Sequence, residues 1–463
     1  MDLHTLPVYR LSELMARKEV SSEEITRAHL ECINRTEDRV KAMVTVTAEA
    51  ALDQARAVDD RRAAGEELSS LAGVPMAIID NICTMGVKTT CASHMLYNFI
   101  PPYDAEVVSR LKDTGAILMG KCNMDEFSIG PADEERGPQA PASRSDGGAA
   151  AVAAGEAAFV LGADTEGSLR QSAARCGVIG LKPTYGRVSR YGLISYASSL
   201  DQIGPLVRDM QDLALVLNAI CGHDARDSTA AAVKVPDYRK CLINDVRGLK
   251  VGLPLEYLAH VEPQSAAVVR QAADRLAELG AICREVSMPH TAYALPAHYI
   301  ISAAEASSNL ARYDGVRYGF RVDDEDVQGM FSKSRGRGFG RAVKTRIMLG
   351  TYVLSAANYD DYYVKALKTR TLVQQDFERV FEKCDCLLAP TGSGIACCDP
   401  AADLSATCDV AANLAGLPSL SLPFGLVDGL PVGLQFMARH FDEEVLLRVG
   451  YTWQENTKHK NKP

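Results

Sequence analysis

GGAAAVAAGEAAFVLGADTEGSLRQSAARCGVIGLKPTYGRVSRY, from Gly147 to Tyr191, is the stretch around which the rest of the chain is organised. Small residues at helical spacing lead into an apolar strand, Ala157 to Gly162. An abrupt turn, Asp164 to Gly167, then presents Ser168. A nucleophile needs an exposed hydroxyl and nearby backbone N–H groups, and a serine on such a turn has both. The same pattern is also typical of a serine that only forms a turn or caps a helix.

On both sides of this stretch, short apolar strands alternate with helical segments. The runs GVPMAIID (73–80), VVSRLKDTGAILMGKCN (107–123) and AAVVRQAADRLAELGAICREVSMP (266–289) show this alternation. It predicts an α/β/α sandwich around a mixed, mainly parallel sheet. We expect a single domain over residues 1–463, with a helical N-terminal part at 1–65, a sheet core at 66–463 and a helical insertion at about 299–380.

Composition and charge restrict the class of protein. The chain has 463 residues, of which 47% are hydrophobic and 24% charged, as in soluble globular proteins. A net charge of −9 excludes a protein that binds nucleic acid through its overall charge, so any contact with nucleic acid is expected only through a partner. The first 20 residues lack an export signal and no apolar run is long enough to cross a membrane. We therefore expect a cytoplasmic protein without membrane contact.

The cysteines raise the question of a metal site. There are 13 of them, and five lie close together in sequence: Cys384, Cys386, Cys397, Cys398 and Cys408. Their C-x-C and CC spacings do not fit the paired C-x2-C pattern of zinc sites. We expect no metal, and reduced cysteines that pack as small apolar residues.

Six runs of sequence carry a resemblance to a known family. The longest is DTEGSLRQSAARCGVIGLKPTYGRVSRYGLISYASSLDQIGP, which begins at Asp164. The others are GVPMAIIDNI (73–82), GKCNMDEFSIG (120–130), EASSNLARYDGVRYG (305–319), RIMLGTYVLSAANYDDYY (346–363) and NLAGLPSLSLPFG (413–425). Together they resemble the amidase signature family, and within it the A-type subunits of bacterial Glu-tRNA(Gln)/Asp-tRNA(Asn) amidotransferases. The resemblance extends over nearly the whole chain.

This resemblance implies a fold, an activity and partners. It implies the amidase-signature type of α/β/α sandwich and a subunit that releases ammonia from glutamine for a partner that amidates mischarged tRNA. The partners implied are B-type and C-type subunits, and the ligand is glutamine or another small amide. No cofactor is implied for this chain, because ATP and Mg would belong to a partner subunit.

The family's catalytic triad is incomplete in this sequence. Members use a nucleophilic serine, a middle serine in a cis peptide and a lysine base. The nucleophile matches Ser168, the lysine position is Ile79 in AIIDN, and an ungapped count places Arg144 at the middle serine. An isoleucine cannot accept a proton, and a guanidinium stays protonated. A hydroxyl without a coupled base is a poor nucleophile, so hydrolysis is expected to be impaired or absent.

The oxyanion turn is altered as well. By resemblance it consists of Thr165, Glu166 and Gly167, and Glu166 replaces one of two consecutive glycines. A carboxylate beside a developing oxyanion opposes its charge, and a Cβ restricts the backbone angles that glycine permits.

The glutamine-binding positions give a mixed picture. In relatives a Tyr, an Arg and an Asp hold the α-groups of the free amino acid. Tyr299 and Arg346 match the first two, whereas the ungapped match for the Asp is Ala406. The ammonium anchor is then missing unless Asp403 or Asp409 takes its place.

Three functions remain open from sequence. The chain is an A-type amidotransferase subunit with weak or no hydrolysis, a catalytically inactive paralogue that serves as a binding or scaffold protein, or an amidase with a rewired site and another substrate. A rewired site would use Ser145 as the middle serine or Lys121 as the base. A catalytic histidine is not expected, since none of the nine lies in a matched motif.

Overall fold

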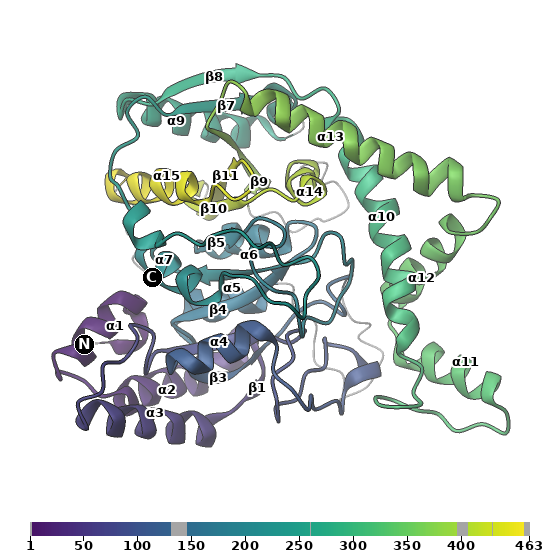
Figure 1. Ribbon diagram of the computed structural model, residues 1–463, viewed down its shortest axis with the longest axis horizontal. Coiled ribbons are helices and arrows are strands. Elements are labelled where there is room, and N and C mark those ends of the chain that lie inside the picture. Colours follow the sequence, from purple (N-terminus) through teal and green to yellow (C-terminus); the bar gives the residue numbers. More distant parts are fainter. Residues whose placement is uncertain (1, 131–145, 260, 396–405, 428, 458–463) are drawn as a thin grey trace.

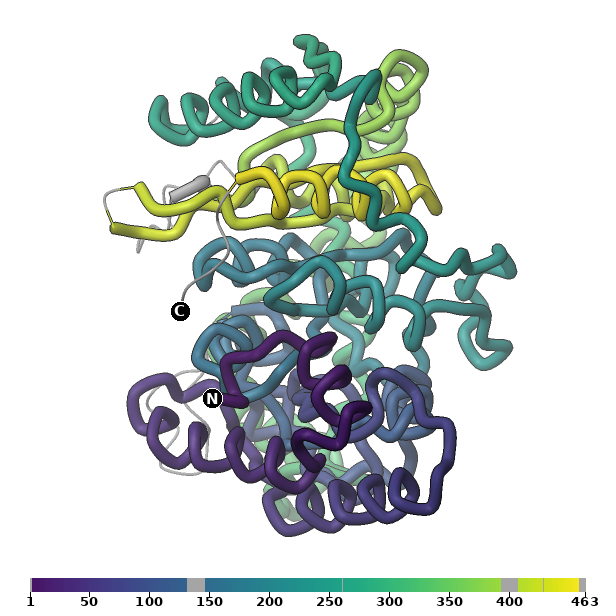
Figure 2. Tube along the Cα trace, turned by 90° about the vertical axis from the view of Figure 1, so that its left-hand side faces the viewer, coloured from purple at the N-terminus to yellow at the C-terminus, as the bar shows by residue number. Residues whose placement is uncertain are grey.

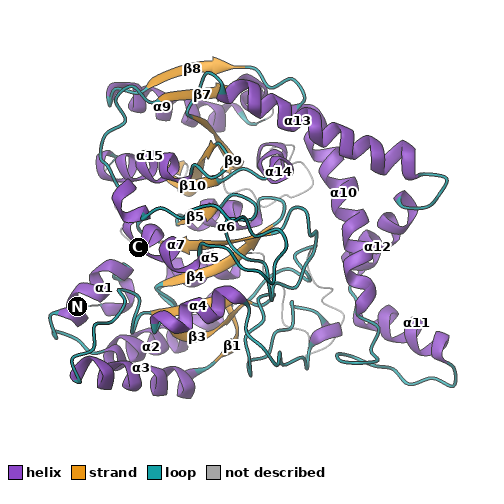
Figure 3. Cartoon of the chain, viewed as in Figure 1, coloured by secondary structure: helices purple, strands orange, loops and turns teal. Residues whose placement is uncertain are grey.

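The structure is a computed structural model that describes residues 2–130, 146–259, 261–395, 406–427 and 429–457. In this part of the chain an 11-stranded sheet forms the core, in the order β1-β3-β2-β4-β6-β5-β10-β11-β9-β7-β8 (Figures 1 and 3). The strands are β1 (Met43–Val46), β2 (Pro75–Ile79), β3 (Ile117–Cys122), β4 (Phe159–Asp164), β5 (Ile179–Lys182), β6 (Gln202–Val207), β7 (Lys250–Pro254), β8 (Ile282–Val286), β9 (Cys386–Ile395), β10 (Ser419–Val427) and β11 (Leu430–Ala438).

The sheet is mixed, as predicted, but it is not mainly parallel. Four neighbouring pairs are parallel, namely β2–β3, β2–β4, β7–β8 and β7–β9. The other six are antiparallel and include the whole centre of the sheet, from β4 to β9. A direct cause is the β10–β11 hairpin, because two strands joined by a tight turn must run in opposite directions. The prediction of a mainly parallel sheet did not allow for the reversal of chain direction between β10 and β11.

Helices cover both faces of the sheet, and others form an insertion beside it (Figure 1). They are α1 (Val8–Ala16), α2 (Ser22–Val40), α3 (Ala48–Ala63), α4 (Glu106–Thr114), α5 (Gly147–Ala154), α6 (Ser168–Cys176), α7 (Met210–Ile220), α8 (Leu255–Ala259), α9 (Pro263–Glu278), α10 (Ala294–Asn309), α11 (Val327–Gly338), α12 (Arg341–Val353), α13 (Lys365–Phe381), α14 (Ala406–Ala415) and α15 (Glu443–Asn456). Single 3₁₀ turns lie at Leu3–Thr5, His94–Leu96, Tyr238–Cys241, Thr291–Tyr293 and Leu310–Arg312, and a π turn at Tyr359–Val364. None of these helices is long and apolar enough to cross a membrane.

Two buried clusters show how the layers pack. One joins the sheet to α1, α4, α7, α9 and α15, and the other contains residues of α10, α13 and α14. Figures 1 and 2 place α1, α2 and α3 at the β1 end of the sheet and α9 with β8 at the opposite end. The predicted α/β/α sandwich is confirmed.

The N-terminal part and the helical insertion differ slightly from their expected extents. Residues 1–65 were expected to be helical, and α1, α2 and α3 do lie there, but β1 was not predicted. This four-residue strand pairs antiparallel with β3. The helices of the insertion run from Ala294 to Phe381, close to the expected 299–380, and α10, α11 and α12 lie to the right of the sheet in Figure 1.

The stretch from Gly147 forms the predicted helix, strand and turn, and a second helix, which was not predicted, follows the turn. α5 is built from small residues and ends at Gly155, whose φ is +83°. A Cβ at Gly155 would lie 2.8 Å from the His4 ring, so both the angle and the space favour glycine. β4 follows and is hydrogen-bonded between β2 and β6. Ser168 then begins α6.

Candidate active site

The turn before Ser168 is fixed by Gly167 and Asp164. Gly167 caps α6 with a φ of +100°, and its N–H donates to Asp164 Oδ1 at 2.9 Å. A Cβ on Gly167 would lie 2.5 Å from the Cβ of Asp409, so the position has no room for a side chain. The hydroxyl of Ser168 donates to the carbonyl of Ala163 at 3.1 Å. Ser168 therefore lies at a helix N-terminus, where backbone N–H groups favour negative charge.

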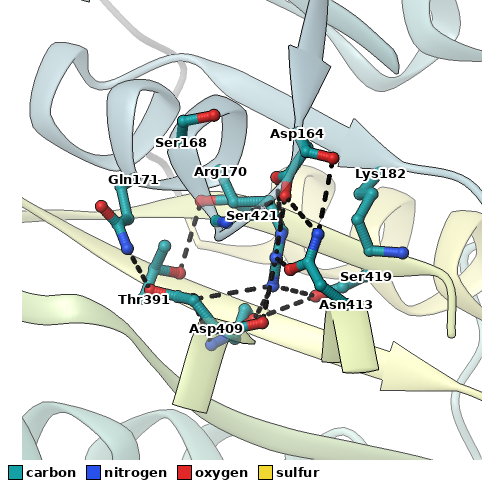
Figure 4. A network of polar contacts seen from close by, with 12 residues as sticks. Asp164, Ser168, Arg170, Gln171, Lys182, Thr391, Asp409, Asn413, Ser419 and Ser421 are labelled. Carbon is teal, nitrogen blue, oxygen red and sulfur yellow. Dashed lines mark hydrogen bonds and ion pairs between the residues drawn. The ribbon is translucent and has the colours of Figure 1, made fainter. Parts of the chain in front are cut away.

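A buried polar network holds this turn from below (Figure 4). Its centre is Arg170, which donates to Asp164 Oδ2 at 2.9 Å, to Asn413 Oδ1 at 2.6 Å and to Gln435 Oε1 at 3.0 Å. Asn413 in turn donates to Asp164 at 2.9 Å. Burial raises the pKa of Asp164, but the charge of Arg170 outweighs it and leaves this pKa below its usual value. The network is fully buried and positions the turn without reaching the pocket.

Sequence reasoning missed this network. Arg170, Asn413 and Gln435 come from α6, α14 and β11, which are far apart in the chain. The available signal was an arginine inside an otherwise small and apolar block, next to an acidic turn. A charged residue in a core needs a partner, but its identity cannot be read from spacing.

Ser168 opens into a small pocket with room for about 60 Å³. Ile79, the last residue of β2, lies in its wall and is 9% exposed. The lining residues are Ile79, Asn81, Met124, Asp125, Ser128, Gly148, Ala149, Gly162, Ala163, Glu166, Ser168, Leu169, Ser172 and Leu206. Among the residues that the structure describes, the lining thus holds two carboxyl groups and no amine, imidazole or guanidinium. At the position expected for the lysine base, the pocket is therefore lined by the aliphatic side chain of Ile79.

Asn81 presents a further polar atom in this pocket. Its amide nitrogen donates to Ser128 Oγ at 3.3 Å, while its carbonyl oxygen is buried without a hydrogen-bond partner among the described residues. A buried unpaired acceptor carries a cost, which a ligand donor or a water would relieve.

Glu166 adds a carboxyl group beside Ser168. It is partly buried, and burial raises its pKa to about 7, while Arg346 counteracts this rise. The neighbouring Thr165 uses its hydroxyl to donate to Asp201 at 2.7 Å. Thr165, Glu166 and Gly167 therefore form the turn next to Ser168. The N–H of Gly167 already donates to Asp164, so it does not point into the turn as a donor for an oxyanion.

Tyr299 and Arg346 are brought together, as the resemblance implied. The guanidinium of Arg346, on α12, lies 4.2 Å from the ring centroid of Tyr299, on α10. It also lies 5.8 Å from the Tyr196 ring and donates to Ser302 Oγ at 3.1 Å. Stacking on aromatic rings leaves the edge of a guanidinium free to bind an anion.

Some expected positions cannot be placed. Arg144 and Ser145 lie outside the described residues, as does Asp403. Ala406 is the first residue of α14, and its side chain is not described. Asp409 is described and is already bound: its carboxylate accepts from Gln171 at 2.9 Å, from Gly392 at 2.9 Å and from Gln435 at 2.7 Å.

Two basic residues near the site, Lys121 and His298, are also engaged in hydrogen bonds. Lys121, on β3, is buried and donates to the Ile82 carbonyl at 2.5 Å and to Thr89 Oγ1 at 3.1 Å. Burial lowers its pKa, but it is not part of the pocket lining. His298, on α10, is buried with its Nε2 3.0 Å from the carbonyl oxygen of Thr165, an acceptor, so this nitrogen donates. Burial lowers the His298 pKa to about 4.

The described residues contain no group of three or more His, Cys, Asp or Glu side chains arranged to hold a metal ion. Of the cysteine cluster, Cys384, Cys386 and Cys408 are buried free thiols. Cys397 and Cys398 lie outside the described residues.

Comparison with known proteins identifies the family of this chain. The amidase family model matches residues 24–447. The A-type subunit of glutamyl-tRNA(Gln) amidotransferase from Moorella thermoacetica is 55% identical over 482 aligned positions, which cover 100% of this chain and 99% of that one. The corresponding protein of Desulforamulus reducens is 53% identical, and the match covers 99% of both chains.

Solved structures show the same fold. The A-type subunit of glutamyl-tRNA(Gln) amidotransferase from Thermotoga maritima superposes with a TM-score of 0.79 at 34% identity, covering 99% of this chain and 96% of its own. Peptide amidase of Stenotrophomonas maltophilia superposes with a TM-score of 0.83 at 29% identity, covering 99% and 98%. The matched family model and these full-length similarities show that the chain belongs to the amidase family and is most similar in sequence, among these relatives, to its A-type amidotransferase subunits.

Proposed function

We propose that this protein is an A-type subunit of a tRNA-dependent amidotransferase whose glutamine hydrolysis is impaired or absent. It would act as a single amidase domain in the cytoplasm, together with B-type and C-type subunits, and would meet tRNA only through them. The whole-length similarity to A-type subunits supports the assignment. One observation carries the proposed loss of hydrolysis: Ile79 forms the pocket wall beside Ser168, where a proton acceptor is required.

The chemistry follows from this wall. Attack by Ser168 on an amide requires removal of its hydroxyl proton, and a coupled base supplies several powers of ten in rate. Here the hydroxyl donates to a backbone carbonyl, which cannot take the proton. Glu166 also brings a carboxylate to the turn where an oxyanion would form. Both features act against the same step, which supports a protein that keeps its fold and its docking role.

The test is ammonia release from glutamine by the purified chain, alone and with B-type and C-type subunits. Wild type and Ser168→Ala are expected to give the same background rate. The combined restoration Ile79→Lys, Arg144→Ser, Glu166→Gly and Ala406→Asp is expected to raise the rate at least about 10³-fold above that background. Ammonia release by wild type at the rate of the restored variant, abolished by Ser168→Ala, would overturn the proposal.

A second candidate, an amidase with a rewired site, is favoured by one observation. Glu166 lines the pocket beside Ser168 and has a pKa of about 7, which suits a general base at neutral pH. Such an enzyme would hydrolyse another primary amide, and both Ser168→Ala and Glu166→Gln would abolish that activity. A panel of small amides assayed with these two variants separates the two candidates.

A further inference from the structure

Asn81 carries a buried hydrogen-bond acceptor beside Ser168. Its side chain is 4% exposed and lines the same pocket as Ser168. The amide nitrogen donates to Ser128 Oγ at 3.3 Å, whereas the carbonyl oxygen has no hydrogen-bond partner among the described residues. Since buried polar atoms are nearly always paired in folded proteins, this oxygen is available to a donor on a ligand in the pocket.

The main chain holds Asn81 at the pocket. The Ile82 N–H donates to the Ile79 carbonyl at 3.2 Å, which closes a tight turn directly after β2. The backbone carbonyl of Asn81 accepts from the Ile194 N–H at 2.8 Å. Position 81 is therefore tied both to the end of the strand and to a distant part of the chain.

Ser128 fixes the side-chain amide of Asn81. Phe127 and Ser128 have φ values of +50° and +60°, which residues with a Cβ rarely adopt. The Ser128 N–H donates to the Asp125 carbonyl at 2.9 Å and so stabilises this turn. Strained backbone is concentrated at functional sites, and here it brings the Ser128 hydroxyl to the amide nitrogen of Asn81.

The charges around the pocket decide which donor suits Asn81. The start of α6, at Ser168, combines the N–H groups that a helix leaves unpaired with the positive end of its dipole, which favours a carbonyl oxygen and disfavours a cation. Glu166 and Asp125 line the pocket and disfavour a second carboxylate. A neutral carboxamide has an N–H for Asn81 and a carbonyl oxygen for α6, in a group small enough for about 60 Å³.

We propose that Asn81 Oδ1 accepts an N–H of the bound amide and makes the pocket selective for amides that keep an N–H over amides whose nitrogen is fully substituted. This deepens the proposed function and rests on it in one respect, that the pocket beside Ser168 admits an amide. A fully substituted amide leaves the oxygen of Asn81 buried and unpaired, which costs binding free energy. Asn81 contacts the ligand but transfers no proton.

The test compares acetamide with N,N-dimethylacetamide, which has no N–H. Binding to the full chain is measured by ligand-observed NMR titration, so the result does not depend on catalysis. Wild type is expected to bind acetamide at least about tenfold more tightly than N,N-dimethylacetamide. Asn81→Leu replaces the amide by an apolar group of similar size. It is expected to bind acetamide about tenfold more weakly than wild type does and N,N-dimethylacetamide within about threefold of wild type.

Matched variants separate this contact from a general effect on the pocket. Ser128→Ala removes the partner that fixes the Asn81 amide and is expected to weaken acetamide binding about threefold. Ser172 lines the same pocket, but its hydroxyl donates to Asp146 at 2.8 Å, so Ser172→Ala is expected to leave acetamide binding within about twofold of wild type. Asn81→Ala provides a second route if the leucine variant folds poorly, and thermal unfolding checks both.

Three outcomes would overturn the inference. Wild type that binds neither amide would show that the pocket does not admit an amide. Folded Asn81 variants that keep the preference of wild type would show that ligand size alone selects. A loss in Ser172→Ala as large as that in Asn81→Leu would show a general effect on the pocket. Ammonia release from glutamine by wild type would instead contradict the proposed loss of hydrolysis, and the ratio of the two binding constants would still test the role of Asn81.

Discussion

Ile79 at the end of β2 and Ser168 at the start of α6 line one pocket. The sheet brings them together because β2 and β4 are parallel neighbours and both end at the same edge. A side chain at position 79 is therefore in the right place to act on Ser168, and its chemistry decides whether it can.

Ile79→Lys tests whether this position accepts a charge. We expect the free energy of unfolding to fall by about 1–3 kcal/mol, because a largely buried ammonium loses solvation, with part of the cost offset by Glu166. Urea unfolding of the single variants and of Ile79→Lys combined with Glu166→Gln measures the offset. The double variant should be less stable than the sum of the two single effects by about 0.5–2 kcal/mol.

Ile78→Lys is the matched control for this cycle. Ile78 precedes Ile79 in β2, is fully buried in a core cluster and is not part of the pocket lining. Its substitution should cost more and should be unaffected by Glu166→Gln. Equal behaviour of positions 78 and 79 would show that the pocket offers no electrostatic advantage to a lysine.

Gly167→Ala tests the turn that presents Ser168. The residue has a φ of +100°, and the added Cβ would lie 2.5 Å from Asp409 Cβ, so both strain and a clash result. We expect a loss of about 2–4 kcal/mol in urea unfolding.

Gly177→Ala isolates the effect of backbone angle alone. Gly177 ends the same helix with a φ of +66°, and a Cβ there meets nothing within 4 Å. Its substitution should cost only about 1 kcal/mol. If both alanines cost the same, the contact with Asp409 does not constrain the turn.

Arg170→Met tests the buried network. It leaves Asp164 and Asp409 buried without their main positive charge, and we expect a loss of about 3–5 kcal/mol. Arg175→Met is the control on the same helix: Arg175 pairs with Asp146, both side chains are 33% exposed, and its loss should cost at most about 1 kcal/mol. Similar losses in the two variants, measured by urea unfolding, would contradict a supporting role for Arg170.

The contrast between these two arginines shows where sequence reasoning reaches its limit. Local pattern predicted the small-residue helix α5, the strand β4, the turn after it and the place of Ser168, because small residues, an apolar strand and a glycine turn follow one another directly. It did not predict the partners of Arg170, since α14 and β11 lie more than 200 residues further along. β1 was missed because four residues between two strong helices carry too little periodicity.

Resemblance supplied what local pattern could not. It implied that Tyr299 and Arg346 serve one site, and the two are stacked although they lie on different helices. It could not imply what the Glu166 side chain does beside Ser168, because the glycine that Glu166 replaces has no side chain. At positions where this chain differs from its relatives, the role of a residue must therefore be argued from the structure and not from the resemblance.

Glu166→Gln should change how stability depends on pH. Burial raises the Glu166 pKa to about 7 from 4.5, so the folded state holds its proton more tightly than the unfolded state does. The stability that this proton gives is fully present below about pH 4.5 and is lost as pH rises through about 7. Urea unfolding at pH 5, 6, 7 and 8 should therefore show the free energy of unfolding of the variant rising relative to that of wild type with each step and levelling off near pH 8.

Asp212→Asn offers a contrast. Burial raises the Asp212 pKa to about 8, so the free energy of unfolding of this variant should still be rising relative to that of wild type at pH 8 and above. A difference between Glu166→Gln and wild type that is constant from pH 5 to 8 would contradict a carboxyl group held protonated beside Ser168.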